Sequence, residues 1–130
     1  MSHFVTIETQ IRDAAALADA CAELGLTLLP NATARGFSGT TRQGDLVIRL
    51  HGPFDIAVNR PSGTGEDAPY TLSTDWWQGH VEKEVGPNYG RLLQLYGVHK
   101  TLREARAKRL RVTRRQESDG SIRLTLTPAA

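Results

Sequence analysis

Cysteine is almost absent from this 130-residue sequence, in which Cys21 stands alone. A single cysteine cannot form a disulfide within the chain, so we expect a reducing, cytoplasmic environment. Cys21 falls between Leu17 and Leu24 at helical spacing, on what we interpret as the apolar side of a helix. That position favours a small core residue over a nucleophile, because no histidine lies near it in the sequence to lower its pKa.

Long hydrophobic runs are also missing. No apolar stretch approaches the roughly 18 residues that a membrane-spanning helix needs, and the first ten residues lack the basic and apolar segments of a secretory signal. Hydrophobic residues make up 39% of the chain and charged residues 23%, a balance typical of a globular protein. Because the apolar stretches are too short to span a membrane, we expect no membrane partner. The absence of an internal repeat or low-complexity segment predicts one domain over residues 1–130.

The sequence patterns of common enzyme classes are missing too. His3, His51, His80 and His99 are scattered without HxxH spacing, so we expect no metal site. No GxSxG or HExxH sequence is present, and no acidic pair stands out. The glycine-containing segment at residues 60–69 lacks the Lys-Ser/Thr ending of a phosphate-binding loop, and we interpret it as a connector. The sequence therefore predicts a protein that is not an enzyme and uses no cofactor.

Positive charge, by contrast, is concentrated in one segment. The net charge is only +2, but residues 100–115 contain eight Lys or Arg and one Glu, which gives 8 − 1 = +7 and leaves −5 for the rest of the chain. Two interpretations remain open: a solvated face with long side chains, or a binding surface for an acidic partner such as nucleic acid. The candidate contact residues in this segment are Arg103, Arg106, Arg109 and Arg111.

The alternation of apolar and polar residues predicts mostly strands, with two longer segments of helical spacing. Helices are expected at residues 13–24, between an Asp13 N-cap and Gly25, and at residues 89–108. Strands are expected at residues 4–9, 26–29, 33–41, 46–50, 54–58 and 70–77, with a turn at Gly44-Asp45, and a final hairpin is expected at residues 110–126. This order predicts an α+β fold, a single two-layer domain in which two helices pack on one face of an antiparallel sheet.

The two tryptophans are adjacent, in the sequence DWW that ends the predicted strand at residues 70–77. Neighbouring side chains on a strand point to opposite faces. We therefore expect one of Trp76 and Trp77 to lie in the core and the other to face a groove or a partner.

Three titratable residues form a candidate pocket: Arg49, Asp75 and His99. His99 falls on the apolar stripe of the second helix, where it could act as a general base or be hydrogen-bonded at the edge of the core. Arg49 lies in mid-strand and needs either solvent or a carboxylate, for which Asp55 across the predicted hairpin is the candidate.

An ordered set of segments resembles a known family. The segments are MSHF at the start, DLVIR and FDIAVNR in the centre, then DWW, YGVHK and SDGSIRLTL, and they extend from Met1 to about Leu126. They resemble the hypothetical chloroplast reading frame thirty-five family, also called domain of unknown function 1257. The positions that match the family, none with an assigned catalytic role, are Asp55, Asn59, Asp75, Trp76, Trp77, Tyr96 and His99. The resemblance implies an accessory or adaptor role beside an AAA-type ATPase.

We therefore expect a small accessory or adaptor protein that acts through protein–protein contacts. Its predicted contact surface joins the outward tryptophan to the basic segment, because Trp and Arg often anchor interfaces. The alternative is a nucleic-acid-binding module that uses residues 100–115. A third interpretation is an enzyme with His99 and Asp75 in a pocket.

Overall fold

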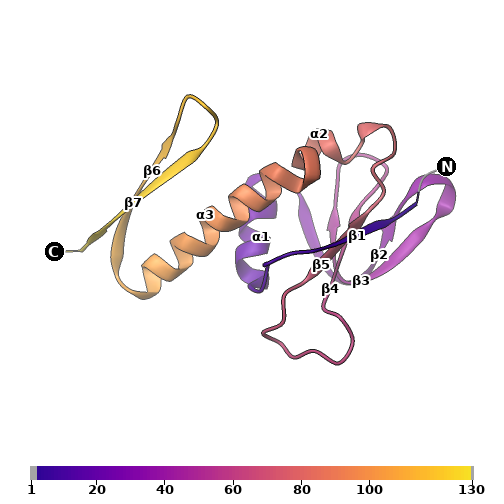
Figure 1. The fold of residues 1–130 in the computed structure, drawn as a ribbon, viewed down its shortest axis with the longest axis horizontal. Helices are drawn as coiled ribbons and strands as arrows, with labels where there is room; N and C mark the ends of the chain where they lie inside the picture. Colours follow the sequence, from indigo (N-terminus) through magenta and orange to yellow (C-terminus); the bar gives the residue numbers. More distant parts are fainter. Residues whose placement is uncertain (1–2, 130) are drawn as a thin grey trace.

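Residues 3–129 are described by a computed structural model in which a five-stranded antiparallel sheet forms one layer (Figure 1). Its strands lie in the order β1-β5-β4-β3-β2. They are β1 (Val5–Glu8), β2 (Thr27–Arg35), β3 (Thr41–Arg49), β4 (Ile56–Asn59) and β5 (Thr71–Thr74). The apolar side chains of one face pack against the helices and form the main core, which includes Ile48, Ile56, Val58 and Leu72.

The first helix, α1 (Ala14–Glu23), begins and ends where the sequence predicts. Asp13 caps it, since its side-chain oxygen Oδ1 accepts hydrogen bonds from the backbone N–H of Ala15 and Ala16. Gly25 follows the helix with a φ of +74°, a left-handed conformation that glycine adopts without strain. Cys21 lies in the core, as expected from its place on the apolar stripe.

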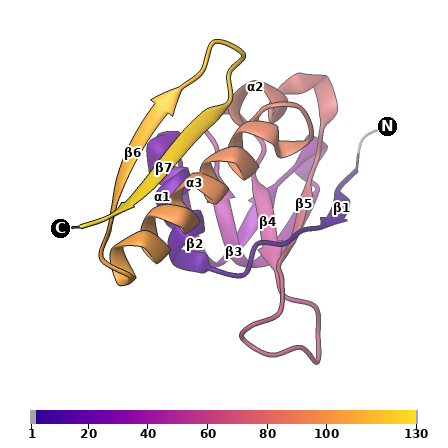
Figure 2. The ribbon, with the colours of Figure 1, turned by 60° about the vertical axis from the view of Figure 1, so that its left-hand side comes forward.

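The longest helix, α3 (Gly90–Ala107), confirms the prediction at residues 89–108 and lies beside α1 over the same face of the sheet (Figures 1 and 2). A short helix, α2 (Glu82–Val85), precedes it. With 18 residues, α3 is about 27 Å long. The α+β arrangement is therefore confirmed.

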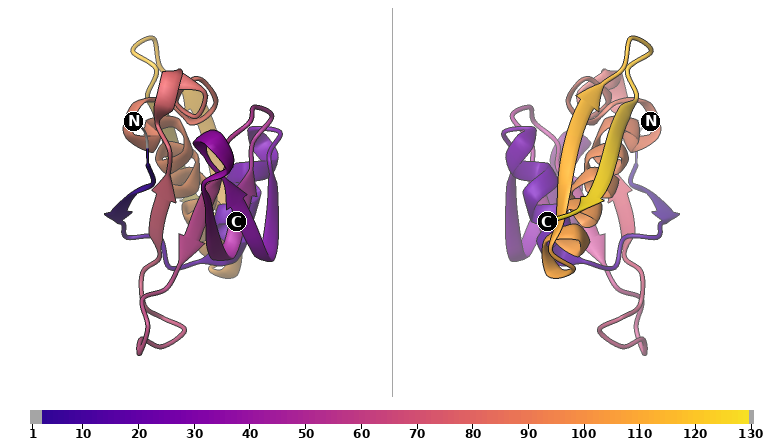
Figure 3. Two further views of the ribbon diagram at one scale, coloured as in Figure 1. Left: turned by 90° about the vertical axis from the view of Figure 1, so that its right-hand side faces the viewer. Right: turned by 90° about the vertical axis from the view of Figure 1, so that its left-hand side faces the viewer.

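The C-terminal hairpin is confirmed, but it forms a sheet of its own. Strands β6 (Leu110–Gln116) and β7 (Ile122–Pro128) pair only with each other within residues 3–129. The helices lie between this hairpin and the five-stranded sheet (Figures 1 and 3). Ile122 packs against the main core, so the hairpin is attached through its inner face.

Two predictions in the centre of the chain are wrong: the end of the first short strand at Leu29 and the turn at Gly44-Asp45. Strand β2 continues through Pro30 and Asn31, because it is an edge strand where a missing N–H is tolerated, and Asn31 takes a φ of 45° without shifting the register. Gly44-Asp45 lies inside β3, and the chain turns instead at the 3₁₀ segment Phe37–Gly39. Gly44 is buried and a Cβ atom there would overlap backbone, so this glycine serves close packing rather than a turn.

The second face of the sheet is also partly covered, because the sheet curls strongly. β3 lies between β2 and β4, yet the carbonyl of Arg35 at the end of β2 accepts a hydrogen bond from the N–H of Asp55 just before β4, at 3.0 Å. The small side chains Ala34, Val47 and Ala57 fill the curl and are fully buried. This curl brings the residues around Asp55 into the interior.

Candidate functional site

The predicted pocket of Arg49, Asp75 and His99 does not assemble. His99 lies on α3 and its Nε2 is 2.7 Å from Oε1 of Glu23 on α1, so it joins the two helices at their surface. Asp75 is fully buried after β5 and accepts hydrogen bonds from the backbone N–H of Phe37 and Trp77, at 3.1 and 3.0 Å. His99 and Asp75 thus stabilise different parts of the fold. The contact with Glu23 agrees with the interpretation of His99 as a residue hydrogen-bonded at the edge of the core.

Arg49 does lie near Asp55 as predicted, with Nη1 3.7 Å from Oδ2, but Asp55 has a closer partner. Arg35 donates from Nε and Nη2 to the two oxygens of Asp55, both at 2.8 Å. The backbone N–H groups of Arg35 and Leu50 donate to the same carboxylate. Burial raises the pKa of Asp55, but these hydrogen bonds outweigh it and hold the pKa below its usual value. Arg35 was not predicted, and the only signal for it in the sequence is that a buried aspartate requires a cation.

The tryptophans do not alternate across a strand, because β5 ends at Thr74. Both rings are half-buried and both pack on the core. Trp76 lies edge-on to Tyr89, with ring centroids 4.8 Å apart, whereas Trp77 lies 4.1 Å from the ring of Phe37. Neither ring is a fully exposed contact point, although Trp76 borders a small hollow.

The predicted surface that joined a tryptophan to the basic segment is divided in the structure. Trp76 contacts Tyr89, which immediately precedes α3, whereas Arg106 lies in the last turn of the same helix. The length of α3, about 27 Å, separates the two ends. These residues therefore belong to two surfaces rather than one.

Within the basic segment, some cations are neutralised by α1. Arg103 makes two hydrogen bonds to Asp19, at 2.6 and 3.1 Å, and Arg114 makes two to Glu23, at 2.9 and 2.7 Å. The hydrogen bonds from Arg114, with a contribution from His99, lower the pKa of Glu23 to about 2. These two arginines hold α3 and β6 against α1.

Other cations of the segment have no such partner. In the described part of the chain no carboxylate oxygen lies within 4.0 Å of the charged nitrogens of Arg106, Lys108, Arg109 or Arg111. All four residues are exposed, at the last turn of α3 and the start of β6. They leave a concentrated positive charge at one end of the molecule.

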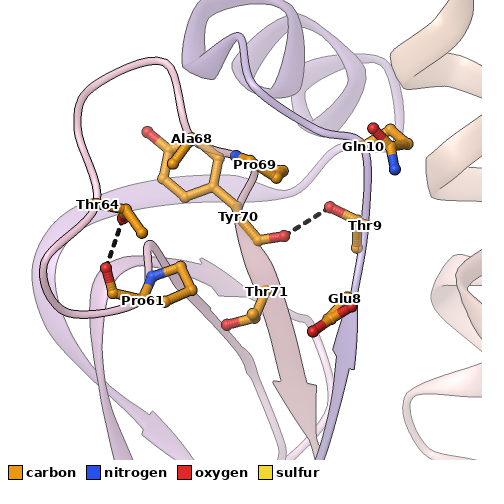
Figure 4. A pocket seen from close by; sticks show the side chains of 9 residues that line it. All are labelled: Glu8, Thr9, Gln10, Pro61, Thr64, Ala68, Pro69, Tyr70 and Thr71. Carbon is orange, nitrogen blue, oxygen red and sulfur yellow. Dashed lines mark hydrogen bonds between the residues drawn. The ribbon is translucent and has the colours of Figure 1, made fainter.

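A hollow of about 490 Å³ opens at the other side of the fold, between the end of β1 and the loop before β5 (Figure 4). Glu8 and Thr71 line its floor, and Thr9 donates to the carbonyl of Tyr70 at 2.7 Å. Arg60 fixes the loop, since it donates to the carbonyl of Ala68 and its guanidinium lies 4.0 Å from the centre of the Tyr70 ring. The hydroxyls of Thr9, Thr64 and Thr71 in this lining are already engaged, because each donates to a backbone carbonyl.

An apolar groove of about 300 Å³ adjoins this hollow along β1. Its lining includes Ile7 and Ile11 on one side and Leu93 and Tyr96 of α3 on the other. Within residues 3–129 no strand pairs with the outer edge of β1, which lies at the rim of the sheet (Figure 3). Val5, on the same strand, is 41% exposed.

Two further properties bear on chemistry. Among residues 3–129, no group of three or more His, Cys, Asp or Glu side chains is placed to hold a metal ion. Burial raises the pKa of the Cys21 thiol to about 12, which disfavours the thiolate. A separate finding concerns membranes: no helix in the described residues has the length and apolar character to span one.

The fold and these surfaces define an α+β protein. The titratable side chains predicted as site residues mainly form hydrogen bonds and ion pairs that stabilise this fold. The family model described as "Protein of unknown function (DUF1257)" matches residues 20–125, and the chain belongs to that family. Comparison with curated proteins gives no match, and neither does comparison with solved structures.

Proposed function

We propose that this protein is a non-enzymatic adaptor or accessory protein that acts by contact with another protein. The observation that carries the proposal is the free outer edge of β1 with the apolar groove beside it. An exposed strand edge offers unpaired backbone N–H and C=O groups to an extended segment of a partner, and adjacent pockets accept alternate side chains.

The two edges of the sheet differ in a way that supports this proposal. The β2 edge contains Pro30 and the positive φ of Asn31, features that discourage the addition of a strand. The β1 edge has the sequence VTIE, with neither proline nor lysine, and the backbone of residues 5–8 has no positive φ. Of the two edges of the five-stranded sheet, only that of β1 is regular within residues 3–129.

Leu93 and Tyr96 of the groove lie on α3, and Trp76 packs against Tyr89, the buried residue that immediately precedes this helix. A partner strand on β1 would lie beside Leu93 and Tyr96. The contact role proposed for the tryptophan is therefore beside the edge strand instead of the basic segment.

A binding role agrees with the state of the titratable groups. His99, Asp75 and Arg49 are engaged with different partners, so the enzyme alternative lacks an assembled acid–base pair. The AAA-type ATPase implied by the family resemblance is the candidate partner, and an adaptor of such a machine needs a recognition edge rather than a catalytic centre.

The test compares two lysine substitutions at equally exposed apolar residues. Val5→Lys places a charge at the β1 edge, and Leu126→Lys places the same charge on the distant hairpin, where the side chain is also 41% exposed. Both variants are expected to keep the stability of the wild type within about 0.5 kcal/mol. In pull-downs from native extract followed by mass spectrometry, a partner should be retained by Leu126→Lys and lost by Val5→Lys.

Two results of that experiment would contradict the proposal. One is the recovery of the same partners with Val5→Lys as with the wild type. The other is the absence of any protein enriched by the wild type over an unrelated bait. If an AAA-type ATPase is among the proteins lost with Val5→Lys, purified ATPase should bind the wild-type chain directly.

Nucleic-acid binding is a second candidate function, favoured by a separate observation. The unpaired cations Arg106, Lys108, Arg109 and Arg111 lie close together in the described chain and are exposed, whereas their neighbours Arg103 and Arg114 are neutralised. Such a cluster binds phosphates with an affinity that falls steeply as salt rises. A mobility shift of mixed oligonucleotides at low salt tests it, and no shift at about 50 mM salt argues against it.

A further inference from the structure

We infer that the outer face of the β6–β7 hairpin, continued by the last turn of α3, binds the phosphate backbone of a double-stranded nucleic acid. This inference rests on nucleic-acid binding, the second function proposed above, and adds the surface and the form of the ligand. The surface is wider than the basic segment 100–115, because β7 contributes to it.

The register of the hairpin places basic and hydroxyl side chains on one face. The directly opposed pairs are Arg111 with Thr127, Thr113 with Thr125, and Arg115 with Arg123. Directly opposed residues of an antiparallel pair share a face. All six residues are exposed, so this face consists of arginine and threonine and is open to solvent.

The inner face of the hairpin fixes the orientation of the outer one. Leu110, Val112, Ile122 and Leu124 are half-buried, and Ile122 packs against the main core. Arg114 belongs to this inner face and is held by Glu23 of α1. The arginines of the outer face are therefore directed away from the helices. The right-hand view of Figure 3 shows the hairpin in front of the helices.

The charges of the outer face are only partly neutralised within the protein. Arg115 and Arg123 are directly opposed like charges, an arrangement that is unfavourable in itself. They share one carboxylate, that of Glu117, whose Oε1 is 3.9 Å from Nε of Arg115 and 3.2 Å from Nε of Arg123. An anion on this face would relieve the remaining repulsion.

The last turn of α3 extends the same positive surface. Arg106, Lys108 and Arg109 lead into β6 and have no carboxylate within 4.0 Å in residues 3–129. Arg109 has a φ of 56°, a left-handed conformation that costs a non-glycine residue about 1 kcal/mol. An arginine at a position suited to glycine keeps a charge there at the expense of stability.

The side chains of this surface indicate a duplex rather than a single strand. Arginine and threonine donate to phosphate oxygens, the contacts that position proteins on duplexes. Recognition of single strands relies instead on aromatic side chains that stack with bases. All Phe, Tyr and Trp residues of the sequence precede residue 97, so the last turn of α3 and the hairpin contribute none of these rings for stacking.

The experiment measures fluorescence anisotropy of a labelled duplex of about 20 base pairs, and of one of its strands alone, from about 50 to 200 mM salt. The full chain is compared with the double variant Arg111→Gln/Arg123→Gln. The matched control is Arg42→Gln/Lys83→Gln, which removes the same charge at exposed positions outside the hairpin. Circular dichroism checks that each variant is folded.

We expect tighter binding of the duplex than of the single strand. The hairpin variant should lower the salt slope of the duplex complex by about 2, one for each arginine that no longer neutralises a phosphate, while the control keeps the wild-type slope within about 0.5. An equal effect of both double variants would mean a general charge effect and would overturn the assignment of the surface.

The remaining outcomes distinguish nucleic-acid binding itself from the preference for a duplex. Equal or tighter binding of the single strand overturns the duplex assignment while nucleic-acid binding stands. Absence of binding to either oligonucleotide at low salt overturns nucleic-acid binding itself. Competition by polyglutamate at the same charge concentration as the duplex points to an acidic protein segment as the ligand and also overturns the inference.

Discussion

Replacement of the buried carboxylate, Asp55→Asn, gives the sharpest test of the curled sheet. Asp55 has no exposed surface, and its oxygens accept from the guanidinium of Arg35 and from the backbone N–H of Arg35 and Leu50. These bonds connect the end of β2 to the start of β4 across the curl. Asparagine removes the charge and turns one acceptor into a donor that faces other donors.

The expected loss of stability is about 2–3 kcal/mol. Removing one partner of a buried ion pair costs roughly 3–5 kcal/mol, because the other charge is left uncompensated. The side chain of Arg35 is 43% exposed, so water can rehydrate much of its guanidinium and the value falls below that range. The matched control is Asp67→Asn, the same change at an exposed loop residue, which should alter stability by about 0.5 kcal/mol or less.

The pH dependence of this loss has a definite sign. The pKa of Asp55 is lower in the folded protein than its unfolded value of about 3.9. The carboxylate therefore stabilises the fold above about pH 4, and this contribution is lost as the pH falls through the folded pKa. Urea unfolding near neutral pH should show the full difference between wild type and Asp55→Asn, and the difference should narrow at about pH 3 and below.

Two results would refute this reasoning. A loss no larger than that of Asp67→Asn near neutral pH would mean that the Asp55 hydrogen bonds do not stabilise the curl. A loss that stays constant from neutral pH to about pH 2 would mean that the effect is steric and not electrostatic.

Three further substitutions test other parts of the structure. Glu23→Gln should destabilise the protein by about 1 kcal/mol near neutral pH, because it breaks the pair with Arg114. Because the pKa of Glu23 is lowered to about 2, urea unfolding should show that the wild type loses this advantage as the pH falls from about 4.5 through 2. Arg109→Gly should raise stability by about 1 kcal/mol, because the φ of 56° suits glycine, yet weaken duplex binding, and no gain in a thermal melt would contradict this. Tyr89→Phe should raise stability by about 1 kcal/mol, because the tyrosine hydroxyl is buried without a hydrogen-bond partner among the described residues. A clear drop in the melting temperature would show that the hydroxyl has a partner.

Local signals in the sequence were sufficient for the two longer helices, α1 and α3, and for the hairpin, whereas the short helix α2 was not predicted. Asp13 and Gly25 satisfy backbone groups next to them, so the limits of α1 could be predicted without knowledge of the rest of the fold. The alternating pattern around the SDGS turn likewise predicted the β6–β7 hairpin. That the hairpin forms a second sheet could not be predicted, because alternation indicates a face but does not say which element covers it.

The turns and the site depended on contacts between distant residues. Gly44-Asp45 has the composition of a turn, but the close packing of β3 requires a glycine there for a different reason. The tryptophans were placed on a strand because TLST reads directly into DWW, whereas Asp75 turns the chain by accepting hydrogen bonds from Phe37 and Trp77. Contacts such as these follow from the curl of the sheet and leave no periodic signal in the sequence.

The two proposed surfaces both adjoin α3, and this bears on how they can work together. The groove contacts α3 at Leu93 and Tyr96, and Arg106 of the basic surface lies about 15 Å further along the helix, whereas the hairpin folds back until its turn accepts a hydrogen bond from Gln94. Sites at this distance are coupled only if an element between them has two alternative arrangements. Here α3 is held to α1 by the Arg103–Asp19 and His99–Glu23 contacts, so it connects the surfaces as a rigid spacer. We therefore predict that the two proposed partners bind at the same time, each with an affinity that does not depend on the other.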